Sequence, residues 1–282
     1  MTIVVGADGS VASRAALTWA IDRARSTGDD LVLATVADDG WGSVGGSALA
    51  ELRGAAERAA ERELQFVRGL APGVEASTTV VVGSPMLALA ETARGADLVA
   101  VGTHKVGYFH GHALGSRSLQ LAAVSSAPTV VVPVTSWRGR AGVAVGAAAG
   151  TDSDDAVRFA AREAKRLGEA LVIVHADGDD EHPAPAERAA SLAAAIHPDL
   201  AIELRSTADP ASGTLIGISR RAVLTVTGRR ASERRFLPLG RTNSDLLMNL
   251  AGPVLVVPAT AATAAAGSSA PESSASSASS AA

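Results

Sequence analysis

The sequence predicts an α/β fold: two doubly wound parallel sheets of five strands each, related as a tandem repeat. Two observations support this fold class. Short aliphatic runs alternate with longer stretches in which apolar residues recur every three or four positions, the spacing of helices that pack on a sheet. The runs also lack the polar alternation of half-exposed strands, which indicates parallel strands covered on both faces. Right-handed crossovers then lead to the doubly wound topology.

Five of these runs are predicted strands in the first half. They span residues 2–6, 31–37, 78–82, 97–101 and 129–134. Four helices are predicted between them, over residues 15–24, 48–70 and 85–93 and from Ser116 to just before Pro128. Gly28 is suited to the end of the first helix and Pro85 to the first turn of the third. Pro133 lacks a ladder donor, so the fifth strand should lie at an edge or end there.

The second half repeats the first. Residues 153–173 align without gaps on residues 13–33 at an offset of 140, and later positions align at an offset of 125. We therefore expect one domain over residues 1–134, a linker over 135–140, a second domain over 141–258 and a disordered Ala/Ser-rich tail over 259–282. Because the linker is short, the two copies should lie against one another.

Composition argues against several classes of function. A formal net charge of −4 offers no general attraction for nucleic acid or an anionic membrane. The absence of cysteine removes disulfides, thiolate metal sites and thiol catalysis. No apolar stretch approaches the ~20 residues of a membrane-spanning helix, and the N-terminal MTIVVGADGS lacks the basic region of a signal peptide. We therefore expect a cytoplasmic protein with neither nucleic acid nor membrane as a partner.

One stretch, residues 101–126, is suited to binding phosphate. A strand leads through a loop with Gly102, Gly107, Gly111 and Gly115 into the helix that begins at Ser116. A helix N-terminus presents unpaired N–H groups and a favourable dipole to an anion, and glycine lets a ligand approach the main chain closely. The Ser116 hydroxyl can cap the helix or contact a phosphate oxygen. A simple strand-to-helix turn has the same local pattern, so this motif is weak by itself.

With Asp8 after the first strand, this glycine loop and the fifth strand in place, the chain resembles the universal stress protein family in tandem form. The resemblance is closer over residues 1–134 than over 141–258. The family's nucleotide motif is Gly, two residues, Gly, nine residues, then Gly-Ser or Gly-Thr. This chain has that spacing from Gly102 to Gly115-Ser116, and Lys105 replaces the second glycine. The resemblance implies a Rossmann-like (HUP-like) sheet of order 3-2-1-4-5, whose first and fourth strands end beside the ligand cleft.

The resemblance also implies which residues hold ATP and an accompanying Mg²⁺. Asp8, with Ala7 beside it, would contact adenine, and Val36 would pack on the base. The remaining site residues are Val101 and Gly102 after the fourth strand, Lys105 in the loop, and Gly115, Ser116, Arg117 and Ser118 in the phosphate-holding turn. Lys105 could add a positive charge to a phosphate, or its aliphatic stem could fill the space that the family glycine leaves open.

The second copy lacks this set. The aligned replacements are Ala148 for Asp8, Thr227 for Gly102, Arg230 for Lys105 and Arg241 for Ser116. We therefore expect nucleotide in the first copy only. The family's members pair through their fifth strands, so residues 129–134 and 254–258 are expected to pair within the chain and cover two open edges. Two tandem chains could associate further as a homodimer.

Two clusters of basic side chains have simpler explanations than a separate site. His104, His110 and His112 lie near Lys105, and without a nearby carboxylate or thiolate they are interpreted as polar surface residues. A His-x-His metal site, or protonated histidines that face phosphates, are the alternatives. Five arginines crowd the corresponding loop of the second copy: Arg229, Arg230, Arg234, Arg235 and Arg241. They could bind an anion, but a solvated loop, or pairing with acidic residues 177–181, is favoured.

No catalytic constellation is visible in the sequence, neither a nucleophile elbow nor a Walker A lysine motif. The preferred hypothesis is an ATP-binding regulatory module of the stress response that uses its first domain. The alternative is a nucleotide-free scaffold in which Lys105 closes the site. Slow ATP hydrolysis is the most catalysis that the sequence supports, so we do not predict an efficient enzyme.

Overall fold

The computed structural model describes residues 1–39, 46–103, 117–135, 139–148, 153–176, 184–230 and 239–259. Several predicted features lie outside these ranges. They are the loop residues Lys105, Gly115 and Ser116, the three loop histidines, Arg234 and Arg235, acidic residues 177–181, and nearly all of the predicted tail.

Strands and helices alternate along the described chain as predicted. The first half contains β1 (Thr2–Gly6), α1 (Val11–Thr27), β2 (Asp30–Ala37), α2 (Gly46–Leu70), β3 (Ala76–Val82), α3 (Pro85–Thr92), β4 (Leu98–Thr103), α4 (Arg117–Val124) and β5 (Thr129–Pro133). The second half contains β6 (Val143–Gly146), α5 (Asp154–Leu167), β7 (Leu171–Ala176), α6 (Ala184–Ile196), β8 (Ile202–Thr207), α7 (Ala211–Ser219), β9 (Leu224–Arg229), α8 (Arg241–Met248) and β10 (Val254–Pro258).

The first helix is longer than predicted because of its cap. α1 starts at Val11, where the Ser10 hydroxyl accepts a hydrogen bond from the Ser13 amide at 3.1 Å. It ends at Gly28, whose φ of 72° is the left-handed conformation that suits glycine, as the sequence predicts.

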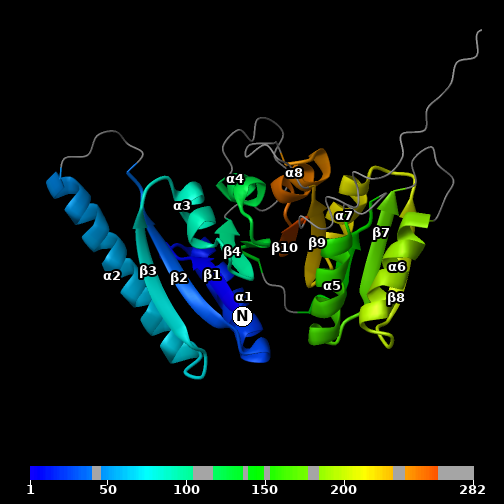
Figure 1. Ribbon diagram of the computed structural model, residues 1–282, viewed down its shortest axis with the longest axis horizontal. Helices are drawn as coiled ribbons and strands as arrows, with labels where there is room; N and C mark the ends of the chain where they lie inside the picture. The colour runs from blue at the N-terminus through cyan, green and yellow to red at the C-terminus, as the bar shows by residue number, and fades with distance from the viewer. Residues whose placement is uncertain are drawn as a thin grey trace, which may run out of the picture.

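All ten strands form one sheet in the order β3-β2-β1-β4-β5-β10-β9-β6-β7-β8 (Figure 1). Within each half the neighbouring strands are parallel and follow the predicted order 3-2-1-4-5. β5 and β10 join the halves as antiparallel neighbours, with Val130 opposite Leu255. These two residues are equivalent in the repeat, so a pseudo-two-fold axis passes between them. Pro133 ends β5, which has a partner strand on each side, so the strand stops there and is not an edge.

The strand register corrects one part of the predicted repeat. β4 beside β1 and β9 beside β6 occupy equivalent places, and their equivalent residues Leu98 and Leu224 differ by 126 positions, not 125. Gly102 therefore corresponds to Gly228, and the predicted replacement by Thr227 is wrong. A one-residue gap leaves the apolar character of a doubly buried strand unchanged, so only the hydrogen-bond ladder reveals it.

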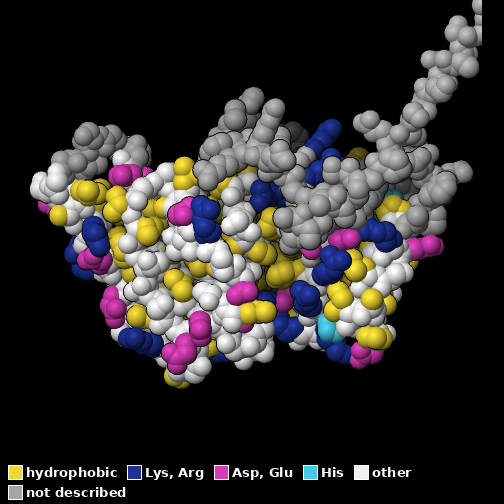
Figure 2. Space-filling view, viewed as in Figure 1, with side chains coloured by type: hydrophobic (Ala, Val, Ile, Leu, Met, Phe, Trp, Pro, Cys, Tyr) yellow, Lys and Arg dark blue, Asp and Glu magenta, His cyan; other side chains and the backbone are white. Residues whose placement is uncertain are grey.

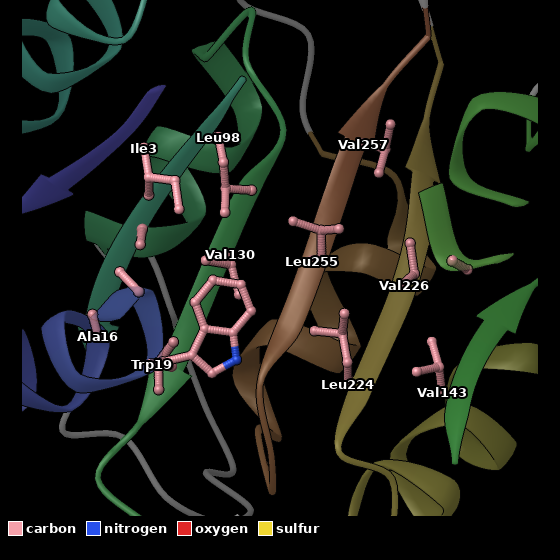
Figure 3. Packing of buried hydrophobic residues seen from close by; sticks show 14 of the residues in the cluster. Ile3, Ala16, Trp19, Leu98, Val130, Val143, Leu224, Val226, Leu255 and Val257 are labelled. Carbon is pink, nitrogen blue, oxygen red and sulfur yellow. The ribbon is translucent and has the colours of Figure 1, made fainter. Parts of the chain in front are cut away.

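Helices cover both faces of the sheet, and each face has its own core. Residues of α1, α2, α5 and α6 pack on one face, and residues of α3, α4, α7 and α8 pack on the other. The first core is continuous across the junction of the halves. Figure 3 shows part of it, with Trp19 of α1, Val130 of β5 and Leu255 of β10. The two halves therefore share one hydrophobic layer on this face.

The outer surface of the helices carries charges of both signs. Figure 2 shows Lys and Arg side chains interspersed with Asp and Glu side chains on the displayed face. On α2, for example, Arg53 and Glu57 lie 3.1 Å apart one helical turn from each other. Within the described ranges, none of the helices has both the length and the apolar character needed to cross a membrane.

Candidate functional site

Three of the predicted binding residues lie at the carboxyl edge of three neighbouring strands. β1 lies between β2 and β4, and the three strands are parallel, so their ends meet at one edge of the sheet. Asp8 follows β1, Val36 lies near the end of β2, and Gly102 lies near the end of β4. α4 begins nearby in the fold at Arg117. In open α/β sheets this edge is where ligands bind, at the point where the strand order reverses.

The Asp8 carboxylate is held by the start of α1. Its Oδ1 accepts a hydrogen bond from the Ser10 amide at 2.9 Å. Partial burial favours the neutral acid, but hydrogen bonds from the Ser10 side chain and amide, with a further one from Ser13, outweigh it and lower the pKa of Asp8 below its ordinary value. Asp8 is therefore ionised at neutral pH. An ionised carboxylate only accepts hydrogen bonds, so it suits a ligand that presents an amino group or a hydroxyl.

A pocket of about 1110 Å³ lies between Asp8, the end of β2 and α2. Alanines of α2 line one wall, and Val36 and Leu52 add larger apolar side chains. Asp8, Asp38, Glu51 and Arg58 contribute charged groups. Mostly apolar walls with a few charged groups are typical of small-molecule sites, and the volume slightly exceeds their usual range of roughly 300–1,000 Å³.

Arg117, predicted to contact phosphate, lies next to this pocket. Its guanidinium is 3.5 Å from the Asp38 carboxylate, which lines the pocket at the end of β2. The Arg117 side chain is 66% exposed, so the ion pair contributes only ~0–1 kcal/mol and a ligand could displace it. Ser118, the next residue of α4, is buried, and its side chain faces away from open solvent.

Two of the predicted site residues have structural roles of their own. Ala7 is buried; its amide donates to the Ala34 carbonyl at 2.9 Å, and its carbonyl accepts the Thr35 hydroxyl at 2.6 Å. Gly102 lies directly under the first turn of α1, where an added Cβ would be 1.8 Å from the Ala12 carbonyl oxygen. Only glycine allows this approach of helix to strand. The fold therefore needs Gly102 whether or not a ligand binds.

The two predicted valines differ in their surroundings. Val36 is half-buried and lines the pocket, as a base-packing residue would. Val101 is 6% exposed and packs in the core on the side of α3 and α4. In the described part of the chain, the pocket thus brings together Asp8 and Val36, with Arg117 beside them, while Val101 supports the strand from behind.

Comparison with known proteins concerns the family and the fold. A family model described as the universal stress protein family matches residues 1–133. The first half of the chain therefore matches the universal stress protein family.

Two mycobacterial universal stress proteins are among its relatives. One from Mycolicibacterium smegmatis is 33% identical over 137 residues, covering 47% of this chain and 45% of that protein. One from Mycobacterium tuberculosis is 30% identical over 132 residues, covering 46% and 47%. The chain thus spans about half the length of the mycobacterial relatives that it matches.

The structural comparison extends over both halves. The crystal structure of a universal stress protein from Archaeoglobus fulgidus covers 91% of this chain and 98% of its own, with a TM-score of 0.76 and 18% identity. A functionally unknown protein from Pseudomonas aeruginosa covers 95% of both chains with a TM-score of 0.57 and 18% identity. At this identity the likeness concerns the fold, and it includes the second half, which the family model does not match.

Several residues that line the pocket were not predicted from the sequence. Asp38 follows β2 as Asp8 follows β1, and the same strand-end position could have indicated it. Glu51, Leu52 and Arg58 come from α2, and nothing in the sequence pattern distinguishes them from the other residues of that helix. Which face of α2 meets the pocket depends on how the helix packs.

The second half of the chain has a different group at two of the matching points. Ala148 replaces Asp8, and its amide donates to the Ser153 hydroxyl at 3.1 Å, so the described residue at this position carries no carboxylate. His175 replaces Thr35, is buried, and its Nδ1 lies 3.0 Å from the Ala147 carbonyl.

Arg229 has a role that the sequence did not indicate. It was predicted to be part of an anion site, a solvated loop or a set of ion pairs. Instead its guanidinium donates to the carbonyls of Ala123 and Ser125, both at 2.6 Å, at the end of α4 in the other half. Burial lowers the pKa of Arg229. Its charge therefore complements the C-terminal dipole of α4, the helix that begins beside the candidate pocket.

Proposed function

We propose that this universal stress protein is a nucleotide-binding regulatory module of the stress response, with ATP bound in the first half. The observation that carries the proposal is the ionised Asp8 carboxylate beside a pocket that also contains Val36. A carboxylate at this position can accept a hydrogen bond from the adenine amino group, and the valine offers an apolar surface for the base. Ala148 at the equivalent point offers neither charge nor acceptor side chain.

The rest of the nucleotide would extend toward α4. Arg117 can exchange its weak contact with Asp38 for a phosphate, because guanidinium groups pair strongly with phosphate oxygens. Lys105, Gly115 and Ser116 belong to the same predicted phosphate turn and lie outside the described residues. Mg²⁺ would accompany the triphosphate and neutralise part of its charge.

Binding is tested on the purified chain by calorimetry with Mg-ATP. The Asp8→Ala variant should bind at least about tenfold more weakly, because it loses a charge-assisted hydrogen bond. An Ala148→Ser control should leave affinity unchanged, since it alters the equivalent point of the half that we expect to be empty. The absence of binding heat at millimolar ATP would contradict the proposal and favour a nucleotide-free scaffold. Mass spectrometry of small molecules released by heat denaturation gives an independent reading.

Lys105→Gly distinguishes the two roles of the lysine. Weaker ATP binding in this variant would mean that the ammonium contacts a phosphate. Tighter binding would mean that the lysine side chain obstructs the site, and this result would favour the scaffold function. Phosphate release that scales with protein concentration and disappears in Ser116→Ala would add slow hydrolysis to the function.

We also propose that the second half serves as the structural partner of the first. β5 and β10 cover one another's edges, and Arg229 supports α4 from the second half. The second half would thus stabilise the nucleotide domain without binding nucleotide itself.

A further inference from the structure

The two halves meet through a charged contact between equivalent residues. Arg23 of α1 and Glu163 of α5 form an ion pair, and only 8% and 3% of these residues' surfaces are exposed. They are 140 positions apart, which is the offset of the repeat in these two helices. Both helices pack on the face of the sheet where Val130 and Leu255 mark the junction. Arg23 and Glu163 therefore lie beside the pseudo-two-fold axis, where a position faces its own equivalent.

Neighbouring groups hold this ion pair in place from both sides. Asp29 lies 3.5 Å from the Nε of Arg23 within the first half, and Arg166 lies 2.8 Å from Glu163 within the second. Arg166 also reaches across to donate to the Ser26 hydroxyl at 2.6 Å, a contact that again joins positions 140 apart. Each buried charge thus has a partner of opposite charge, as burial requires. In two consecutive turns of α1 and α5, the residues at equivalent positions of the repeat differ from one another.

A charged residue beside the axis distinguishes the pairing of two unlike halves from the pairing of two like halves. If two identical first halves met through this face, Arg23 would face Arg23, and two second halves would bring Glu163 against Glu163. Buried charges of the same sign in contact are strongly unfavourable. The β5–β10 junction has no such discrimination, because antiparallel main-chain hydrogen bonds form equally well between two copies of either strand.

We propose that Arg23 and Glu163 make this face specific for the two unlike halves and select against like halves of two chains. The short connection from β5 to β6 then favours the halves of the same chain, because it gives them a high effective concentration. The tandem chain is a self-contained pair that admits no second copy through this face.

Complementary charge reversals in two full-length chains test the proposal. R23E and E163R each place like charges at the axis of their own chain, so each alone should be less stable than the wild type. When the two variants are produced together, their charges are complementary. The reversed position of each chain can face the same position of the other chain, which is not reversed and carries the opposite charge. Native mass spectrometry should then detect a 1:1 dimer of the two variants, at least about tenfold more abundant than any dimer of either variant or of the wild type alone.

The Arg14–Glu63 pair supplies the matched control. It also joins an arginine of α1 to a buried glutamate, at 3.1 Å, but both residues belong to the first half. R14E and E63R should destabilise the chain without associating when produced together. The same association in this control pair would overturn the proposal.

A neutral double variant keeps the test decisive if the reversals fail to fold. R23Q/E163Q removes the charges without repulsion and keeps the strand junction, so the chain should fold and lose its selectivity. Its interchain dimer should rise at least about tenfold over the wild type at equal concentration. The proposal fails if R23Q/E163Q shows no such rise, or if R23E and E163R keep the wild-type mass and unfolding midpoint and remain separate when mixed.

Discussion

The substitution Gly102→Ala tests whether Gly102 is needed for packing or for ligand binding. In the structure the added Cβ would lie 1.8 Å from the oxygen and 2.1 Å from the carbon of the Ala12 carbonyl, and 2.8 Å from the Ser13 amide nitrogen. All three obstacles are backbone atoms of α1, so no side-chain rotation relieves the overlap. The start of α1 must move away from β4, and the Asp8–Ser10 contact at the same helix start would be disturbed with it.

The expected cost follows from the size of this overlap. Overpacking of a core typically costs 1–3 kcal/mol and occasionally more. Because a helix backbone has to move, we expect a loss of about 3 kcal/mol or more. For a chain of this size that corresponds to a fall in melting temperature of at least about 6–12 °C. Denaturant and thermal unfolding of the nucleotide-free chain measure it.

A glycine with free space around it is the control for this substitution. Gly217 lies in α7 with nothing within 4 Å of an added Cβ, so Gly217→Ala should stabilise the chain by ~0.5–1 kcal/mol through its higher helix propensity. If Gly102→Ala kept the wild-type unfolding midpoint but lost nucleotide binding, the close-packing explanation would be refuted. The glycine would then be a ligand residue alone.

Two further predictions use the charged groups of the site and of the junction. The pKa of Asp8 is lowered from 3.8, so the folded state favours the ionised form; the stabilisation is present above that value and is lost as the pH falls through the folded-state pKa. Asp8→Asn should therefore lose less stability than the wild type on acidification below about pH 4, measured by denaturant unfolding at each pH; parallel curves would refute this. Arg229→Met should cost ~1–3 kcal/mol and speed amide exchange in α4, because two carbonyls of the other half lose a charged donor. Arg140→Met loses two similar bonds, to Ser219 and Ala251, and should speed exchange near the ends of α7 and α8 but not in α4. Equal exchange in α4 for both variants would contradict the role of Arg229.

The parts of the site that sequence reasoning could find are those at strand ends. Asp8 and Val36 stand next to aliphatic runs, and a parallel sheet brings the ends of such runs to one edge. The α2 wall of the pocket could not be found in this way. Arg58 and Leu52 face the pocket because of the angle at which α2 crosses the sheet, and that angle depends on packing with distant residues.

Prediction from the sequence has a similar limit in the second half. Its strands were recognisable from composition, but β9 is shifted by one residue from the aligned position, so Gly228 and not Thr227 matches Gly102. Apolar runs buried on both faces tolerate such a shift without a change in pattern. The arginines of this half were visible as a cluster, yet their partners were not, because Arg229 bonds to carbonyls that carry no side-chain signal.

The sequence by itself determined the α/β class, the tandem repeat and the half that carries the acidic residue at its first strand end. These features depend on local composition and spacing, which the order of residues records directly. Only the tertiary structure decided that Gly102 lies under α1, that Arg229 bonds to α4, and that Arg23 faces its equivalent Glu163. Each of these contacts joins segments far apart in the chain, so it exists only once the sheet has brought them within bonding distance.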